Sequence, residues 1–323
     1  LESLTLSNNS IGGTIPFSLG NIEPLQTIIL LKNRLHGSIP SSLGNLLNLD
    51  MLDLKNNSLA GPLPPSLGNL HRLTILDVYI NALTGPIPDS YSNLTSLQYV
   101  DLYDNSLTGT IPSFLGRISN LTYLYLGENA FTGTIPDSIG DLKKLISFYA
   151  NINHLTLEGT IPACLFELPR LQTLHISGVG LSASLPANLT MRPGFADLAL
   201  SHNYLVGDIP LEIQTRQWAS LDLSYNHLDG TLNKEFIAQS ENAELKLGNN
   251  RLSGAVPKGI LDSTGLVAIL AGNRFSCDPM KQNLPQQDAH YAEFQCGSNT
   301  FNLSYYFWIS AAGLLLVVCL LYT

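Results

Sequence analysis

Apolar residues recur along this chain about every 24 positions, in the pattern L-x-x-L-x-L-x-x-N-x-L-x-G-x-I-P. One unit carries this pattern at Leu97, Val100, Leu102, Asn105, Leu107, Gly109, Ile111 and Pro112. The alternation of apolar and polar residues around Leu102 predicts a short strand with one buried face. A fixed period of this length is expected of a solenoid, in which each coil packs mainly on its neighbours. The sequence therefore predicts one elongated stack of about 12 coils with a parallel sheet along one side.

An asparagine follows each predicted strand, where the chain turns. Its amide carries two donors and one acceptor, so a buried amide can satisfy turn backbone groups that stacked coils hide from water. We expect a structural ladder made of Asn9, Asn33, Asn57, Asn81, Asn105, Asn129, Asn153, Asn203, Asn226, Asn250 and Asn273. The ladder is interrupted at Val179, after a segment that holds two extra residues before Gly159. We interpret this irregularity as local drift of the repeat.

The rest of each unit predicts how the coil returns to its start. Gly109 and its equivalents permit a backbone conformation that a Cβ atom would oppose. Pro112 ends the extended segment and opens the outer one. The outer arm S-x-L-G-N-L-x-x-L, as in residues 42–49, is short, so we expect it to be irregular or 3₁₀ helical.

This unit resembles the plant-type leucine-rich repeat, whose signature includes the L-x-G-x-I-P element seen at residues 35–40, 83–88 and 131–136. The resemblance covers nearly all of residues 1–276. It implies a right-handed superhelix with the parallel sheet on its concave side and short 3₁₀ or irregular segments on its convex side. Residues 277–296 resemble the disulfide-linked C-terminal cap of extracellular repeat proteins.

Four cysteines occur in the chain, at Cys164, Cys277, Cys296 and Cys319. Only Cys277 and Cys296 look paired, since they bracket a short stretch after the last repeat, and such a pair implies an oxidising compartment. Two free thiols in a cytosolic chain are the alternative. We expect Cys164 and Cys319 to be unpaired.

The C-terminal residues predict a membrane anchor. No charged residue occurs from Gln295 to Thr323, and residues 305–322 are almost wholly apolar, with aromatic residues near both ends. Eighteen helical residues would span roughly 27 Å, close to the hydrocarbon thickness of a bilayer. We expect a juxtamembrane linker at residues 297–304 and a single transmembrane helix at 305–322. A buried helix of a globular domain is the alternative.

Six N-x-S/T sites predict glycosylation, at Asn8, Asn56, Asn93, Asn120, Asn188 and Asn302. Together with the expected cap and anchor, they place the repeats outside the cell, on a single-pass protein of the plasma membrane. The chain begins inside a repeat and lacks an initiating Met, so we interpret it as a fragment with a truncated N-terminus.

Charge and motifs argue against several classes of function. The formal net charge is -9 and no basic run occurs, so nucleic acid is not an expected partner. The chain has no Gly-rich loop, H-R-D or D-F-G element, and no other catalytic motif supports an enzyme. No cofactor is indicated. His175 and His202 lie on adjacent coils but in different columns and without an obvious third ligand, so we expect no metal site.

Tyrosines gather at strand positions predicted to face the concave surface. We expect the ligand-binding residues to be Tyr79, Tyr99, Asp101, Tyr103, Tyr123, Tyr125 and Tyr149. Clustered aromatic residues offer a large, rigid contact area with a polar tip, which suits recognition. The alternative is that tyrosine simply favours strands. Asp53, Asp77 and Asp101 lie beside these tyrosines; we expect solvated carboxylates on an open surface, with nothing to raise their pKa.

The resemblance implies a receptor. It suggests a cell-surface ectodomain with a membrane anchor that recognises a peptide, a glycan or a partner protein, and that signals through a co-receptor kinase or a kinase domain beyond residue 323. Some receptor kinases of this family hold a peptide carboxylate with an R-x-R pair, but no Arg occupies a concave position here. The alternative is a cell-surface scaffold or inhibitor of wall-degrading enzymes.

Overall fold

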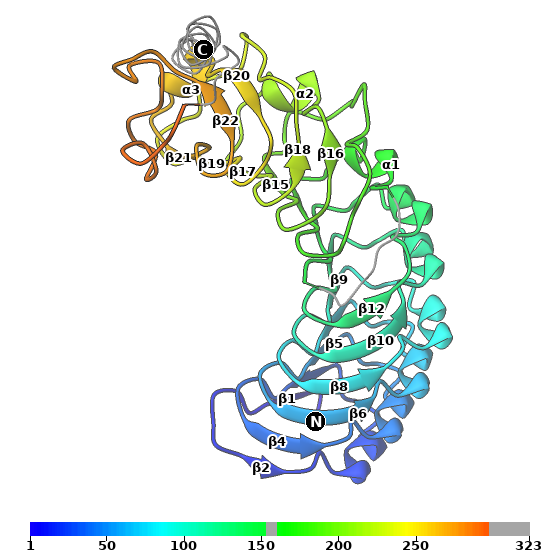
Figure 1. Cartoon of the computed structure of the whole chain (residues 1–323). Helices are drawn as coiled ribbons and strands as arrows, with labels where there is room; N and C mark the ends of the chain where they lie inside the picture. Colours follow the sequence, from blue (N-terminus) through cyan, green and yellow to red (C-terminus); the bar gives the residue numbers. More distant parts are fainter. Residues whose placement is uncertain (153–159, 297–323) are drawn as a thin grey trace, which may run out of the picture.

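The chain forms a curved stack of coils, with short helices along its outer side (Figure 1). A computed structural model describes residues 1–152 and 160–296. The predicted solenoid with a parallel sheet is confirmed. Within the described ranges, no helix is both long and apolar enough to cross a membrane. The expected linker at residues 297–304 and the expected transmembrane helix at 305–322 lie outside these ranges.

A 12-stranded parallel sheet follows the inner side of the stack. Its strands are β1 (Ser3–Thr5), β3 (Thr27–Ile29), β5 (Met51–Asp53), β7 (Ile75–Asp77), β9 (Tyr99–Asp101), β11 (Tyr123–Tyr125), β13 (Ser147–Tyr149), β14 (Thr173–His175), β15 (Asp197–Ala199), β17 (Ser220–Asp222), β19 (Glu244–Lys246) and β21 (Leu266–Ala268). Equivalent positions pair from coil to coil, so Asp53 lies opposite Asp77, and Asp77 opposite Asp101. This register aligns side chains of successive repeats in straight columns.

A second parallel sheet, which the sequence pattern did not predict, lies between the inner strands and the outer helices. It comprises β2 (Gly12–Gly13), β4 (Arg34–Gly37), β6 (Ser58–Pro62), β8 (Ala82–Gly85), β10 (Ser106–Thr110) and β12 (Ala130–Thr132). The S-L-x-G segment after each ladder asparagine is extended, and its backbone pairs with the same segment of the next coil. Farther along the described chain, β16 (Val206–Gly207) pairs with β18 (His227–Leu228), and β20 (Ser253–Ala255) with β22 (Arg274–Ser276). Single parallel bridges also join Ser184 with Val206 and Thr231 with Ser253.

The outer arms begin directly after the proline of each I-P element. In the first six coils they are 3₁₀ helices, as expected: η1 (Phe17–Asn21), η2 (Ser41–Asn45), η3 (Pro65–Asn69), η4 (Asp89–Asn93), η5 (Ser113–Arg117) and η6 (Asp137–Asp141). Three later arms differ and form single α-helical turns: α1 (Ala163–Phe166), α2 (Leu211–Gln214) and α3 (Lys258–Leu261). The extended backbone of Pro112, with φ of −72°, marks one of these boundaries.

The periodic apolar residues fill a continuous core between the sheets and the outer arms. In one coil, Leu97, Val100, Leu102, Leu107 and Ile111 are each at most 3% exposed. Full burial of such a side chain contributes about 1.5–3 kcal/mol. Because every coil repeats this set, the solenoid has one core that runs along its whole length.

Glycine and serine bring the outer arms into close contact. A Cβ atom on Gly68 would lie 2.5 Å from the carbonyl oxygen of Ser90 on the next coil. The Ser90 hydroxyl in turn donates to the carbonyl of Pro65 at 2.7 Å. Cys164, on α1, takes the place of this serine, and its Sγ atom lies 3.5 Å from the carbonyl oxygen of Asp137. It is a free thiol in the structure, as expected.

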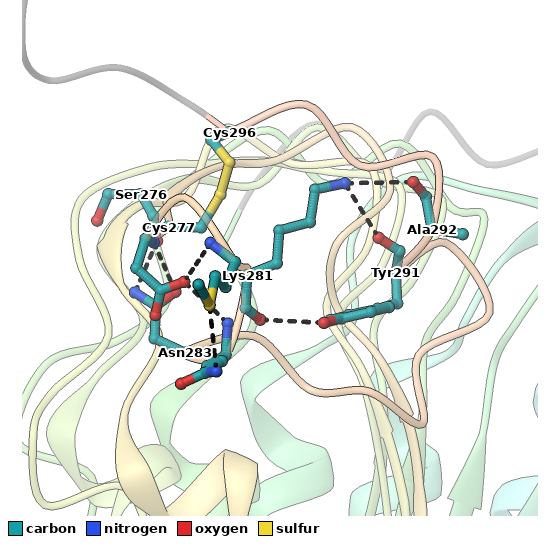
Figure 2. Close-up of a disulfide and its surroundings, with 10 residues drawn as sticks. Ser276, Cys277, Lys281, Asn283, Tyr291, Ala292 and Cys296 are labelled. Atoms are coloured by element: carbon teal, nitrogen blue, oxygen red, sulfur yellow. Dashed lines mark hydrogen bonds between the residues drawn. A yellow bond between two sulfur atoms is a disulfide. The ribbon is translucent and has the colours of Figure 1, made fainter.

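The residues after the last repeat form a compact cap (Figure 2). Cys277 and Cys296 are joined by a disulfide, with their Cα atoms 5.5 Å apart. Between them, the Lys281 ammonium donates to the carbonyls of Tyr291 at 3.5 Å and Ala292 at 3.2 Å. The Tyr291 hydroxyl donates back to the carbonyl of Lys281 at 3.3 Å. The disulfide and these hydrogen bonds hold the two ends of the cap together.

The cap covers the apolar end of the last coil. Leu284 and Phe294 are buried against the core. The Asp288 carboxylate is 3% exposed, and its Oδ2 atom accepts hydrogen bonds from the backbone N–H groups of Ile269 at 2.6 Å and Leu270 at 2.9 Å. Asp288 thus satisfies backbone donors that have no further coil to pair with.

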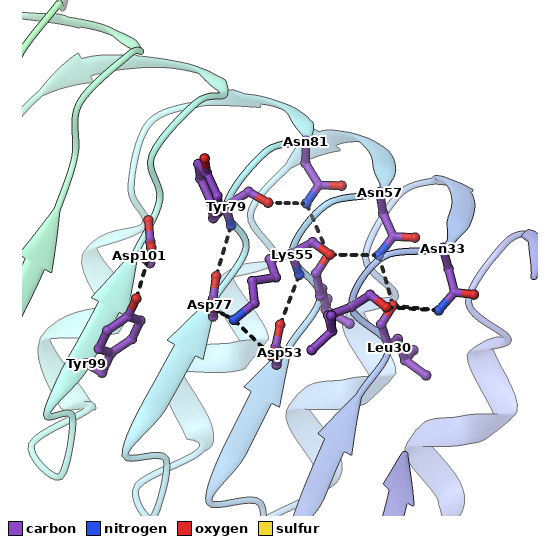
Figure 3. Close-up of polar contacts among 12 residues, drawn as sticks. Leu30, Asn33, Asp53, Lys55, Asn57, Asp77, Tyr79, Asn81, Tyr99 and Asp101 are labelled. Atoms are coloured by element: carbon purple, nitrogen blue, oxygen red, sulfur yellow. Dashed lines mark hydrogen bonds and ion pairs between the residues drawn. The ribbon is translucent and has the colours of Figure 1, made fainter. Parts of the chain in front are cut away.

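The turn asparagines tie each coil to the one before it (Figure 3). The Nδ2 atom of Asn57 donates to the carbonyls of Leu54 and Lys55 in its own coil and of Leu30 in the preceding coil, at 3.0–3.3 Å. Its Oδ1 atom accepts from the Leu35 N–H at 3.1 Å. The same donor pattern occurs at Asn33, Asn81, Asn105, Asn129, Asn203, Asn226 and Asn250.

The ends of the ladder and its interruption have reduced contacts. Asn9, in the first coil, donates only to the carbonyls of Leu6 and Ser7 of its own coil. Asn273 donates to one carbonyl in each of two coils. Val179 is fully buried, and its backbone N–H donates to Asn203 Oδ1 at 3.1 Å. Asn153 lies outside the described residues.

Candidate functional site

Three outward-facing columns cross the middle of the inner sheet. Because the strands pair in register, Tyr123 lies opposite Tyr99, and Tyr149 opposite Tyr125. We call the six aligned side chains the tyrosine patch: Tyr79, Tyr99, Tyr103, Tyr123, Tyr125 and Tyr149. All six are half-buried, since their rings pack on the sheet and on one another. The sequence pattern thus placed these residues on one face, and the register brings them together.

The rings of the tyrosine patch are in direct contact. Ring centroids are 5.6 Å apart for Tyr79 and Tyr103, 5.7 Å for Tyr99 and both Tyr123 and Tyr125, and 4.7 Å for Tyr125 and Tyr149. Such pairs contribute about 0.5–1.5 kcal/mol each beyond their buried area. These contacts restrict the orientations that the rings can adopt.

A hollow of about 370 Å³ opens on the concave face within this region. Its walls are formed by Tyr79, Asp101, Tyr103, Tyr125, Tyr149, Asn151 and His175. Its volume falls in the range of pockets that bind small ligands. Tyr99 and Tyr123 do not line the hollow but pack beside it against the Tyr125 ring.

Two residues of the hollow were not among the predicted binding residues. His175 stacks on Tyr149, with centroids 4.4 Å apart and ring planes 10° from parallel. Its Nε2 atom lies 2.9 Å from the Asp197 carboxylate. Asn151 lies in the same column as Tyr79 and Tyr103. Both residues lie in columns predicted to face the concave surface. Neither is a tyrosine, so a prediction based on clustered tyrosines did not include them.

Gly127 allows two residues in the wall of this hollow to pack closely. It lies between Tyr103 and Asn151 in the column that also contains Tyr79. A Cβ atom on Gly127 would come within 2.6 Å of Asn151 Oδ1 and 2.8 Å of a Tyr103 ring carbon. The glycine therefore lets both neighbouring side chains pack across it.

The carboxylate row corrects one expectation. Asp53, Asp77 and Asp101 were expected to be solvated, yet they are only 2%, 3% and 7% exposed. The Lys55 ammonium lies 3.3 Å from an oxygen of Asp53 and 2.7 Å from one of Asp77 (Figure 3). These carboxylates lie in the central column, where longer side chains from the flanking columns cover them. The L-D-L pattern predicted which face of the sheet these side chains lie on, but not how little of them is exposed to solvent.

No basic side chain among the described residues forms an ion pair with Asp101. Its carboxylate accepts the Tyr103 backbone N–H at 3.0 Å and the Tyr99 hydroxyl at 3.1 Å. Burial, with a smaller contribution from the Asp77 carboxylate, raises the pKa of Asp101 to about 6, although these hydrogen bonds and Lys55 act in the opposite direction. The expectation that nothing here would raise a pKa was therefore wrong. Burial also raises the pKa of Asp77, but the Lys55 ammonium opposes this effect.

A second carboxylate contacts the tyrosine patch. The Tyr103 hydroxyl donates a short hydrogen bond to Glu128. Burial and this contact raise the pKa of Tyr103 to about 12, so the hydroxyl stays protonated and acts as a donor. Carboxylates thus hold two tyrosine hydroxyl groups, that of Tyr103 in the wall of the hollow and that of Tyr99 beside it.

The two histidines considered for a metal site have other neighbours. His175 is held by Tyr149 and Asp197, whereas His202 stacks on Tyr225 with centroids 4.3 Å apart. In the described part of the chain, no group of three or more His, Cys, Asp or Glu side chains is arranged to hold a metal ion.

The predicted glycosylation sites differ in their surroundings. Asn8, Asn93 and Asn188 are exposed, whereas Asn56 and Asn120 are half-buried. Asn120 donates to the carbonyl of Thr95 at 3.1 Å and accepts from Lys144 at 2.7 Å, so a glycan there would displace two contacts. Asn302 lies outside the described residues. Glycosylation stays a prediction.

Comparison with known sequences places the chain in a family. Residues 4–193 match the family model described as a leucine-rich repeat region. Receptor-like protein 39 of Arabidopsis thaliana is 36% identical over 144 residues, covering 43% of this chain and 16% of the relative. Receptor-like protein 35 of the same plant is 37% identical over 180 residues, covering 53% and 19%. The chain spans less than a fifth of the length of these relatives.

Solved structures agree with the sequence match. A TDR receptor superposes with a TM-score of 0.78 at 28% identity, covering 91% of this chain and 50% of that one. The plant peptide hormone receptor RGFR1 in complex with RGF2 gives 0.69 at 29%, covering 86% and 52%. The Arabidopsis receptor kinase HAESA, in complex with the peptide hormone IDA and the co-receptor SERK1, gives 0.66 at 29%, covering 85% and 58%. The chain therefore belongs to the leucine-rich repeat family.

Proposed function

We propose that this chain is the ligand-recognising, membrane-anchored part of a plant cell-surface receptor, and that its tyrosine patch binds a peptide or protein ligand. The observation that carries the proposal is the open hollow, four of whose walls are rings of the tyrosine patch held by contacts with neighbouring rings. Rigid aromatic surfaces give much binding area for little loss of side-chain entropy. Two solved relatives hold peptide hormones, which favours a peptide over a glycan.

The remaining parts of the proposal concern signalling and location. One solved relative is in complex with a co-receptor, which supports passage of the signal to a second receptor chain. The apolar residues 305–322 would anchor the repeats outside the plasma membrane. Fractionation of plant cells that express the full chain, beside a chain ending at residue 304, tests the anchor. We expect only the full chain in the membrane fraction; equal release of both would contradict an anchor and favour a secreted inhibitor or scaffold.

The binding proposal is tested by removing two rings at the centre of the tyrosine patch. Peptides selected from a random display library against the full chain should lose at least about tenfold in affinity on Tyr103→Ala/Tyr125→Ala, or about 1.4 kcal/mol. A matched control is Tyr204→Ala/Tyr225→Ala, because these rings are 59% and 52% exposed but lie away from the patch. Circular dichroism confirms folding of both variants. Equal binding by the two double variants would show that the peptides bind outside the tyrosine patch.

A further inference from the structure

The hollow in the tyrosine patch has more carboxylates than free cations around it. Asp101 lies in its wall, and Glu128 contacts the Tyr103 hydroxyl. The two nearby basic groups already have partners, because Lys55 lies 2.7 Å from Asp77 and His175 lies 2.9 Å from Asp197. Among the described residues around the hollow, Asp101 therefore has no cationic partner of its own.

The excess of carboxylates around the hollow also affects the pKa of a tyrosine hydroxyl group. The pKa of Tyr79 is raised, first by burial and then by the nearby carboxylates of Asp104, Asp101, Glu128 and Asp77. A phenol whose ionisation is opposed by four carboxylates lies in a region of negative potential. A ligand carboxylate would meet the same repulsion there.

The walls of the hollow also have spare acceptor capacity. Each Asp101 oxygen accepts one hydrogen bond, from the Tyr103 N–H or the Tyr99 hydroxyl, whereas a carboxylate oxygen has two lone pairs. The Oδ1 atom of Asn151 is buried against Gly127 and has no hydrogen-bond partner among the described residues. Tyrosine rings add electron-rich faces, which attract cations but not anions.

Building on the proposed function, we propose that the hollow takes a positively charged side chain of the ligand, arginine or lysine, with Asp101 as its counter-ion. Ammonium and guanidinium groups carry only donors, which match the unused acceptor capacity of the Asp101 carboxylate. The low exposure of Asp101 strengthens its attraction for a cation that enters the hollow. The ligand therefore presents a basic residue to the centre of the concave face.

The test uses four pools of random peptides, each with one residue fixed at the centre: Arg, Lys, Gln or Glu. The full chain is incubated with each pool, and the captured peptides are quantified by mass spectrometry. We expect the Arg and Lys pools to be captured at least about tenfold more than the Gln and Glu pools. Asp101→Asn should remove most of this preference, because asparagine keeps an acceptor for the Tyr103 N–H but not the charge.

A matched variant excludes general attraction to an acidic protein. Asp222→Asn removes the same charge from the same column, five strands farther along the sheet. It should leave the preference for Arg and Lys unchanged. An equal loss in both variants would contradict the inference, because net charge alone would then explain the capture.

Other outcomes separate this inference from the proposed function. Equal capture of all four pools, still sensitive to Tyr103→Ala/Tyr125→Ala, would overturn the cation site and leave the tyrosine patch as the binding surface. Failure to capture peptides from any pool would contradict the proposed function, and the cation site with it.

Discussion

Asn105 illustrates how a single side chain joins neighbouring coils. Its Nδ2 atom donates to the carbonyls of Leu102 and Tyr103 in its own coil and of Val78 in the preceding one. Its Oδ1 atom accepts from the Leu83 N–H at 3.0 Å. A buried turn amide was expected to do this, because its two donors and one acceptor suit the backbone groups of a tight turn.

Asn105→Ala leaves those backbone groups without partners. We expect a loss of about 1–3 kcal/mol in the free energy of unfolding, measured by urea denaturation. Asn69→Ala is a suitable control, because Asn69 is exposed at the end of η3. Equal stability of the two variants would show that the ladder does not hold the coils together.

Asp101 shows what the repeat pattern leaves undetermined. The pattern predicted that its side chain would leave the sheet on the concave face, and it does. Its burial depends on Tyr99, two residues before it, and on Tyr103, two residues after it. These neighbours vary from coil to coil, so a pattern shared by all coils carries no information on their packing.

The raised pKa of Asp101 predicts a pH-dependent stability change. Folding favours the protonated acid, so stability falls as the pH rises from about 4, the ordinary value, to about 6, the folded value. Asp101→Asn avoids this ionisation and keeps an acceptor for the Tyr103 N–H. We expect a gain of about 1–3 kcal/mol above pH 6 that disappears below pH 4. An equal gain above pH 6 and below pH 4 would show that ionisation of the buried Asp101 carboxyl group does not destabilise the fold.

At the scale of elements, the structure has more backbone pairing than the sequence pattern indicates. The L-x-L segments predicted the inner strands, because apolar and polar residues alternate there. The segments of the second sheet, such as β10, do not show this alternation clearly, since Gly109 interrupts them in a left-handed conformation with φ of 81°. Their pairing follows from coil stacking, which aligns equivalent backbone segments.

The outer arms depend on glycine for their close approach. Gly68→Ala places a methyl group against the backbone of Ser90, so one coil must shift away from the next. We expect a loss of about 1–3 kcal/mol in urea denaturation. Gly194→Ala is the matched control, because a Cβ atom there has no neighbour within 4 Å. A loss at Gly194 as large as that at Gly68 would contradict the packing account.

At the scale of the whole molecule, the tyrosine patch lies near the middle of the inner sheet. It spans β7, β9, β11 and β13, with three strands before it and five after it. The period and the L-x-L pattern sufficed to predict this placement. In a solenoid each strand pairs with the equivalent strand of the next repeat, so the number of the repeat determines the position of its strand in the sheet. The hollow could not be predicted, since it results from how particular rings, Gly127 and Asn151 pack together.

The central claim is that ligand recognition takes place on the tyrosine patch. Carbene footprinting of the full chain, with and without the tightest-binding selected peptide, tests it at residue resolution. We expect protection of Tyr79, Tyr103, Tyr125 and Tyr149 and unchanged labelling of Tyr204 and Tyr225. Protection of the latter two residues alone, or of none of the six, would contradict the account.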